Sequence, residues 1–189
     1  HDDGLQRYGF HGLSYTYIAQ ELARRVPDVA AGRVVALHLG SGASLCAIRG
    51  GRSVDSSMGY STLDGVPMGT RCGALDAGVL LDLLQQRGMT PHELEDLLYH
   101  RCGLLGVSGR SADVRTLEAA SAIGDIPSTE ALALFAVRCA GEVGRLAGVP
   151  TAGVGEALVH GGVPAVRCRR HVGVREGIGH RAALAGVAV

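Results

Sequence analysis

The residues best suited to chemistry lie in short glycine-containing segments, and the first two of these come early in the chain. In RYGFHG, residues 7–12, His11 stands between Gly9 and Gly12, which cannot crowd it, so its ring can reach a ligand and donate to developing negative charge. The alternative is a histidine that only bonds backbone in a turn. In His38-Leu39-Gly40-Ser41-Gly42, the glycines let backbone N–H groups approach an anion, as in a phosphate-binding turn. Here the alternative is an ordinary hairpin turn.

Two further segments place charged side chains beside glycines. Arg71 in MGTRCG, residues 68–73, is suited to clamp a phosphoryl group or a carboxylate with paired hydrogen bonds, although a surface arginine in a loop would look the same. In SGRSADVR, residues 108–115, we expect Ser111 to be a helix N-cap and Asp113-Val114-Arg115 to form the first turn. An aspartate at that place stabilises a helix whatever the protein does.

The elements that must position these residues are a β-meander followed by helices, which favours a single α/β domain. Apolar β-branched runs and the Gly50-Gly51 turn predict strands over Val34–Leu39, Ser44–Arg49 and Arg52–Met58. Helical spacing and capping residues predict helices over Ser14–Arg25, Asp76–Arg87, Thr90–His100, Ser111–Ala120 and Ser128–Leu146, with Ser14 as a cap and a capping box at Thr90. The residues expected to face inward are Val79, Leu80, Leu83 and Leu84 in one helix and Leu132, Phe135, Val137 and Val143 in another.

Composition excludes several classes of protein. Lysine plus arginine and aspartate plus glutamate number 18 each, so the chain lacks the basic excess of a nucleic-acid binder. No apolar run is long enough to span a bilayer, which predicts no membrane association. The five cysteines, Cys46, Cys72, Cys102, Cys139 and Cys168, form no C-x-x-C pair, so we expect reduced thiols and a cytoplasmic location.

Taken together and in this order, the segments RYGFHG, HLGSGAS, SVDSSMG and MGTRCG resemble the acetate kinase family, from Arg7 to about Gly144. The resemblance implies the RNase-H-like (actin-like ATPase) fold of the sugar kinase, Hsp70 and actin superfamily. It also implies a phosphotransferase that converts ATP and acetate to ADP and acetyl phosphate, uses Mg²⁺ and forms a homodimer. Residues 1–189 would correspond to the C-terminal nucleotide-binding domain, without the N-terminal lobe and the extreme C-terminus.

Roles carry over by position. His11 and Arg71 resemble the family residues that stabilise the transferring phosphoryl group, His38 to Gly42 the turn against the ATP phosphates, and Asp113 to Arg115 the segment that contacts the nucleoside. The family residues that contact the metal have no counterpart here, so no metal ligand is predicted in this chain. The sequence departs from the family pattern at Ser41, which replaces an asparagine, at Tyr15, which replaces a histidine, and at Cys72 and Ala74.

The segment 150–173 is atypical. The family has a second phosphate-binding turn after an apolar strand, and Gly153-Val154-Gly155-Glu156 matches its letters but has no such strand before it. Either the turn is there, with an insertion behind it, or it has been lost. From Val174 a helix-like pattern resumes, and Val174–Arg181 resembles the helix that normally follows the turn.

Three readings remain at this point: an acetate kinase lobe, a propionate kinase lobe, and a non-catalytic ATP-binding or dimerisation fragment. One methylene separates acetate from propionate, and an apolar pocket gains only about 1–3 kcal/mol from it. The kinase interpretations require that His11, the turn at 38–42 and Arg71 converge on one anion-sized space.

Overall fold

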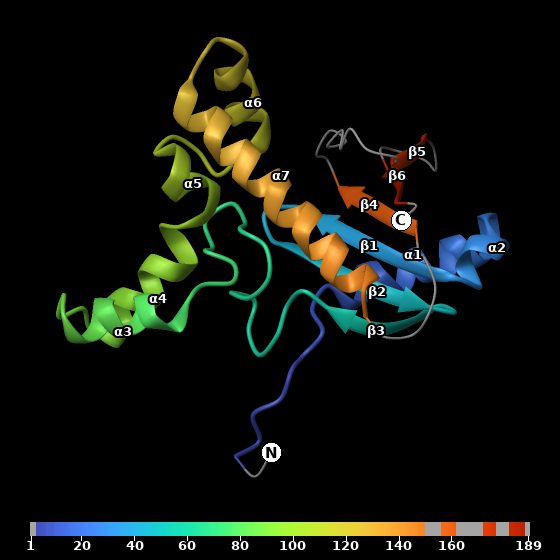
Figure 1. Cartoon of the computed structure of the whole chain (residues 1–189), viewed down its shortest axis with the longest axis horizontal. Helices are drawn as coiled ribbons and strands as arrows, with labels where there is room; N and C mark the ends of the chain where they lie inside the picture. Colours follow the sequence, from blue (N-terminus) through green and yellow to red (C-terminus); the bar gives the residue numbers. More distant parts are fainter. Residues whose placement is uncertain (1–2, 150–155, 162–171, 177–181, 188–189) are drawn as a thin grey trace.

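The computed structural model describes residues 3–149, 156–161, 172–176 and 182–187. At its centre is a six-stranded mixed sheet in the order β3-β2-β1-β4-β6-β5 (Figure 1). Strands β1 and β4 run parallel, and the other neighbouring pairs are antiparallel. The strands are β1 Arg33–Leu39, β2 Ala43–Arg49, β3 Arg52–Ser56, β4 Glu156–Gly161, β5 Val172–Glu176 and β6 Ala182–Val187.

The meander predicted from the sequence is confirmed by strands β1 to β3. The β1–β2 ladder runs from Arg33 opposite Arg49 to Leu39 opposite Ala43. Between β2 and β3, Gly50 and Gly51 have φ values of 51° and 76°. A two-residue hairpin turn requires this left-handed conformation at both of its central residues, and glycine adopts it readily. Because the β1–β2 ladder is in register to its end, the turn at residues 40–42 is held by strands on both sides.

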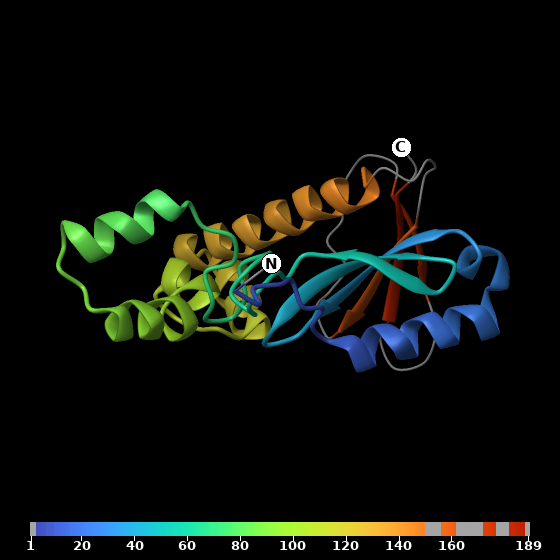
Figure 2. The ribbon, with the colours of Figure 1, turned by 90° about the horizontal axis from the view of Figure 1, so that it is seen from below.

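Two helices cover opposite faces of this sheet, α1 on one side and α7 on the other (Figure 2). Alternation along β1 explains this arrangement, since successive side chains point to opposite faces. Val35 and Leu37 pack in the core under α7 with Phe135, while Val34 and Ala36 belong to the second core under α1. The helices are α1 Gly12–Arg25, α2 Pro27–Ala30, α3 Ala77–Gln85, α4 Pro91–His100, α5 Gly103–Ser108, α6 Val114–Ala122 and α7 Ile126–Ala147.

Helix α1 differs from its prediction at its N-terminus. It begins at Gly12 with His11 at the N-cap position, and no side chain caps it. Ser14 is not the cap because its hydroxyl is hydrogen-bonded to His38 Nδ1 at 3.0 Å, across to strand β1. The prediction of Ser14 as a cap was therefore wrong, and the reason is a tertiary contact that competes for the same oxygen.

Helices α3 and α4 form an arm that extends away from the sheet (Figures 1 and 2). The predicted capping box at Thr90 is confirmed, with Pro91 in the first helical turn. The predicted inward face of α3 is only partly confirmed, because Leu80, Leu83 and Leu84 are half-buried, whereas Val79 is 43% exposed and no residue of the helix is fully buried. On α7, Val137 is 68% exposed, since Phe135 and Cys139 define the buried stripe and Val137 points away from it.

The chain after α7 differs from one expectation. Residues 172–176 form strand β5 rather than the start of a helix, since valines alternate with other residues there and pair with β6. An apolar strand, β4, begins at Glu156, after the residues whose letters match the second phosphate-binding turn. The predicted residues Gly153, Val154 and Gly155 lie outside the described residues.

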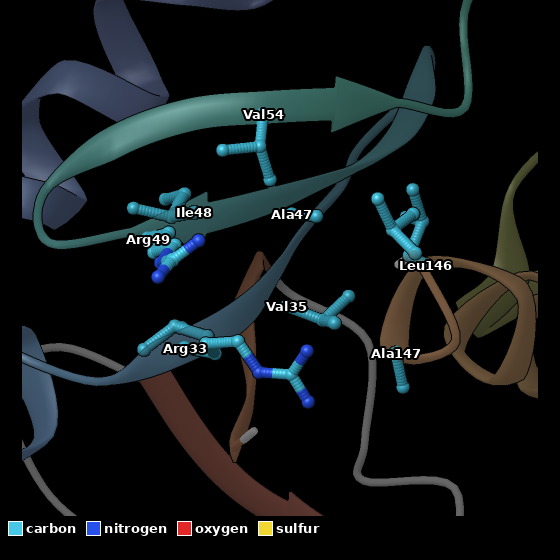
Figure 3. A pocket seen from close by; sticks show the side chains of 10 residues that line it. Arg33, Val35, Ala47, Ile48, Arg49, Val54, Leu146 and Ala147 are labelled. Carbon is cyan, nitrogen blue, oxygen red and sulfur yellow. The ribbon is translucent and has the colours of Figure 1, made fainter. Parts of the chain in front are cut away.

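A small cavity lies where the end of α7 meets the meander (Figure 3). Its volume is about 20 Å³, and its walls include Val35, Ala47 and Leu146. A space of this size holds about one water molecule. It is therefore too small for a ligand such as a nucleotide. In the part of the chain that the structure describes, no helix combines the length and apolarity needed to cross a bilayer.

Candidate anion site at the β1–β2 turn

His11 is held in an unusual backbone conformation at the start of α1. Its φ is 58°, the one left-handed non-glycine residue in the described part of the chain. The segment before it is fixed to the end of the meander, because Tyr8 N donates to Gly59 O at 2.9 Å and Arg7 donates to Ser56 O at 2.7 Å. Such backbone strain costs about 1–3 kcal/mol and is typical of functional positions.

His11, Gly42 and Arg71 meet at one point. A Cβ added to Gly42 would lie 3.5 Å from His11 Nε2 and 3.5 Å from an Arg71 terminal nitrogen, Nη1. The three groups come from the start of α1, from the β1–β2 turn and from the loop before α3. His11 Nε2, Arg71 Nη1 and the glycine turn therefore lie close together, as the kinase interpretation requires. An anion would meet donors there on at least two sides.

The loop that carries Arg71 is closed by its own backbone. Met68 N donates to Arg71 O at 3.0 Å, and Cys102 N donates to Thr70 O at 2.9 Å. Gly103 has φ 60°, and a Cβ there would overlap the Met68 carbonyl and lie 2.7 Å from Arg71 O. The start of α5 thus packs directly under the backbone of Arg71, where only glycine fits.

A second histidine supports the first. The rings of His11 and His38 stack with centroids 4.0 Å apart and planes 15° apart. Burial, followed by the charges of His38 and Arg71, lowers the pKa of His11. At neutral pH the His11 ring is therefore neutral, and it can donate one hydrogen bond without carrying charge. Sequence reasoning did not find the hydroxyls of Ser14 and Ser44 that hold these rings, because the contacts span 24 and 33 residues.

The predicted segment 108–115 lies close to the β1–β2 turn at Ala112. A Cβ added to Gly69 would lie 3.2 Å from Ala112 Cβ and 3.5 Å from Ser41 O. The predicted N-cap at Ser111 is wrong, since the cap of α6 is Asp113, two residues later, which accepts from Arg115 N at 2.8 Å. The Asp113 carboxylate also pairs with the Arg115 guanidinium at 2.7 Å, and this hydrogen bond holds the pKa of Asp113 at about 2.

The register of β4 shows which of its ends lies near the site. Leu39 pairs with Gly161, so Gly161 stands beside the β1–β2 turn. Glu156 pairs with Val34, at the opposite end of β1. The structure therefore does not bring Glu156 to the other predicted residues. The signal that indicates Gly161 is the apolar run Ala157–Val159, which ends just before it.

The described residues do not form a metal site, since no group of three or more histidine, cysteine, aspartate or glutamate side chains among them could hold an ion. The four described cysteines, Cys46, Cys72, Cys102 and Cys139, are free thiols.

Comparison with known proteins decides the family. The model of the acetokinase family matches residues 1–172. The chain belongs to the acetokinase family. The acetate kinase of Methylocella silvestris is 54% identical over 149 residues, which cover 79% of this chain and 36% of that protein. The acetate kinase of Nitrobacter hamburgensis is 49% identical over 162 residues, covering 82% and 39%.

Solved structures of acetokinase relatives show the same fold. The crystal structure of Porphyromonas gingivalis acetate kinase superposes with a TM-score of 0.74 at 35% identity, covering 77% of this chain and 37% of that chain. A propionate kinase from Francisella tularensis gives 0.73 at 33% identity, covering 77% and 38%. The α/β fold is therefore the actin-like, RNase-H-like fold expected from the sequence. The chain spans well under half the length of these acetokinase relatives.

Proposed function

We propose that this chain is the nucleotide-binding lobe of a kinase that transfers the terminal phosphoryl group between ATP and acetate. The observation that carries the proposal is the convergence of His11 Nε2 and Arg71 Nη1 on the empty side of Gly42. Phosphoryl transfer needs little covalent chemistry from the protein, and positioning with charge stabilisation supplies nearly all of the catalysis. A neutral N–H donor and a guanidinium at one anion-sized space are suited to that task.

Each part of the site has a role in this proposal. Acetate attacks the terminal phosphorus in line, and Arg71 and His11 bind the equatorial oxygens as their charge rises. The backbone of residues 38–42 faces the phosphates, and the segment 113–115 lies toward the nucleoside. Gly161 is beside the phosphate turn through the pairing of β4 with β1.

The family implies Mg²⁺ as a cofactor. In the described residues no group of three or more histidine, cysteine, aspartate or glutamate side chains could hold the ion, and the roles proposed above belong to His11, Arg71 and the backbone of residues 38–42.

Acetate is the proposed substrate, with propionate as the alternative, because one of the similar structures is a propionate kinase. A homodimer in the cytoplasm is expected from the family, and the free thiols support a reducing compartment. Sedimentation of the purified protein measures the oligomeric state directly.

Replacing Arg71 tests the proposal in a protein that contains this chain and the remainder of the kinase. We expect Arg71→Ala to lower kcat by about 10²- to 10³-fold, with a small change in the KM for ATP, because the guanidinium acts on charge that develops in the transition state. Arg101→Ala is the matched control, since Arg101 is exposed and pairs with Asp96 at the end of α4. Unchanged turnover in Arg71→Ala would remove this residue from the mechanism.

A second candidate is that the 189-residue chain alone binds nucleotide without catalysis. The chain covers only 36% and 39% of the length of the two acetate kinases compared above, and this partial coverage favours binding without catalysis. Acetyl phosphate trapped as a hydroxamate from the isolated chain with ATP and acetate would contradict it.

A further inference from the structure

Ser44 lies at the centre of a buried chain of hydrogen bonds behind His11. Its side chain is fully buried on strand β2 and faces α1. The Ser44 hydroxyl oxygen lies 2.6 Å from the Tyr15 hydroxyl and 2.8 Å from His11 Nδ1. Because a serine hydroxyl has one hydrogen, it can donate to only one of these two neighbours.

Burial decides the direction of this chain. Tyr15 is 7% exposed and packs in the core with Ile18 and Leu22. Burial raises the pKa of Tyr15, so its hydroxyl keeps its hydrogen. Ser44 Oγ is the side-chain acceptor that the described residues offer to that hydrogen. If Ser44 donated to Tyr15 instead, the tyrosine hydrogen would be left in the apolar core without this acceptor, which is unfavourable.

The direction of the chain fixes the form of the imidazole. Tyr15 donates to Ser44 Oγ, and the Ser44 hydrogen then needs an acceptor of its own. A serine oxygen can accept twice, but if His11 Nδ1 also donated to it, the hydrogen of this fully buried hydroxyl would have no side-chain acceptor among the described hydrogen bonds. Ser44 therefore donates to His11 Nδ1, which accepts and carries no hydrogen. In the neutral ring the hydrogen is therefore on Nε2. Nε2 is the atom that faces Gly42 beside the Arg71 guanidinium. The charged and titratable groups around the ring are His38, Arg71 and Tyr15.

We propose that Tyr15 and Ser44 are positioning residues that hold His11 in the Nε2–H tautomer, so that the neutral ring presents a donor to the phosphoryl site. The inference rests on the proposed function for its catalytic meaning, but the tautomer itself can be measured without any turnover. Tyr15 stands where the sequence departs from the family pattern of a histidine. Because its hydroxyl stays protonated across neutral pH, it can donate to Ser44 throughout that range.

The test is ¹⁵N NMR of the histidine rings in the isotope-labelled chain at about pH 8, with His11 assigned by comparison with His11→Gln. We expect Nδ1 without hydrogen and Nε2 with hydrogen in the unmodified chain. Tyr15→Phe keeps the aromatic ring but removes the hydroxyl, so Ser44 is free to rotate. The ratio of the Nε2–H to the Nδ1–H tautomer of His11 should then fall about 3- to 10-fold, because one neutral hydrogen bond is lost. The ratio should approach that of His92, which is exposed. Tyr17→Phe, on the same helix and 54% exposed, should leave the ratio unchanged.

Ser44→Ala tests the same relay independently if Tyr15→Phe does not fold, and it should move the ratio in the same direction. A hydrogen on Nδ1 in the unmodified chain would overturn the proposal, and so would an unchanged ratio in folded Tyr15→Phe or Ser44→Ala. In the longer kinase, Tyr15→Phe should lower kcat more than it changes the KM for ATP. If Arg71→Ala leaves turnover intact while the NMR result holds, the proposed function fails and the tautomer assignment stands.

Discussion

Gly42 lies in the turn between β1 and β2, where an added methyl group would stand 3.5 Å from both His11 Nε2 and Arg71 Nη1. That distance is an ordinary van der Waals contact, and Gly42 is not among the residues with positive φ. An alanine would therefore fit the folded chain but occupy the space that the two donors enclose. A substitution at Gly42 can therefore affect ligand binding without affecting the stability of the fold.

Gly42→Ala should leave the midpoint of thermal unfolding nearly unchanged and raise the Kd for ADP about 10-fold or more, equivalent to about 1.4 kcal/mol. Scanning calorimetry and titration calorimetry measure the two quantities on the same sample. Gly9→Ala is the control, because nothing lies within 4 Å of a Cβ there. An unchanged Kd in Gly42→Ala would take the β1–β2 turn out of the binding site.

At the scale of elements, the start of α5 determines where Arg71 lies. The N–H of Leu104 donates to Met68 O at 2.9 Å, so the helix and the arginine loop are joined backbone to backbone. Gly103 is the contact point, and its φ of 60° and the nearby carbonyls exclude a side chain. A helix of six residues thus fixes the loop that carries Arg71 through a single glycine.

Gly103→Ala should lower the free energy of unfolding by about 3–5 kcal/mol, from left-handed strain plus overlap with the Met68 carbonyl. Gly109→Ala separates the two causes, because Gly109 has the same φ of 60° but nothing within 4 Å. It should lose only about 1–2 kcal/mol. Urea unfolding measures both, and equal losses would show that the close packing under Arg71 is unimportant.

Local signals predicted some elements well and tertiary contacts decided the others. The Gly50-Gly51 turn and the Thr90 capping box were confirmed because a few adjacent residues determine them. The start of α1 was missed because His38, 24 residues away, uses the hydroxyl of Ser14. The proximity of His11, Gly42 and Arg71 at the candidate anion site was expected through family resemblance, whereas the hydrogen bonds through Ser44 join residues too far apart in sequence to be predicted.

Across the whole molecule, Asp55 joins three parts that are far apart in sequence. It follows the bulge in β3, and its carboxylate pairs with Arg145 of α7 at 2.7 Å and with Arg7 at 3.5 Å. Arg7 begins the segment that ends at His11, so this network ties the histidine side of the site to the sheet and to the helix above it. The carboxylate is 20% exposed, which limits screening by water.

Replacing Asp55 by asparagine removes this charge at nearly constant shape. Burial acts to raise the pKa of Asp55, but the hydrogen bond and charge of Arg145 outweigh it and hold the pKa below its ordinary value. The charge therefore stabilises the fold above the unfolded pKa of about 4, and this contribution is lost as pH falls through the folded pKa.

Asp55→Asn should lower the free energy of unfolding by about 1–2 kcal/mol at pH 7 and by progressively less below pH ~4, measured by urea unfolding at each pH. Asp96→Asn, which breaks an exposed pair with Arg101, should lose under about 1 kcal/mol at pH 7. If the loss in free energy of unfolding for Asp55→Asn were the same below pH ~4 as at pH 7, the shape of the side chain, and not its charge, would hold the three segments together.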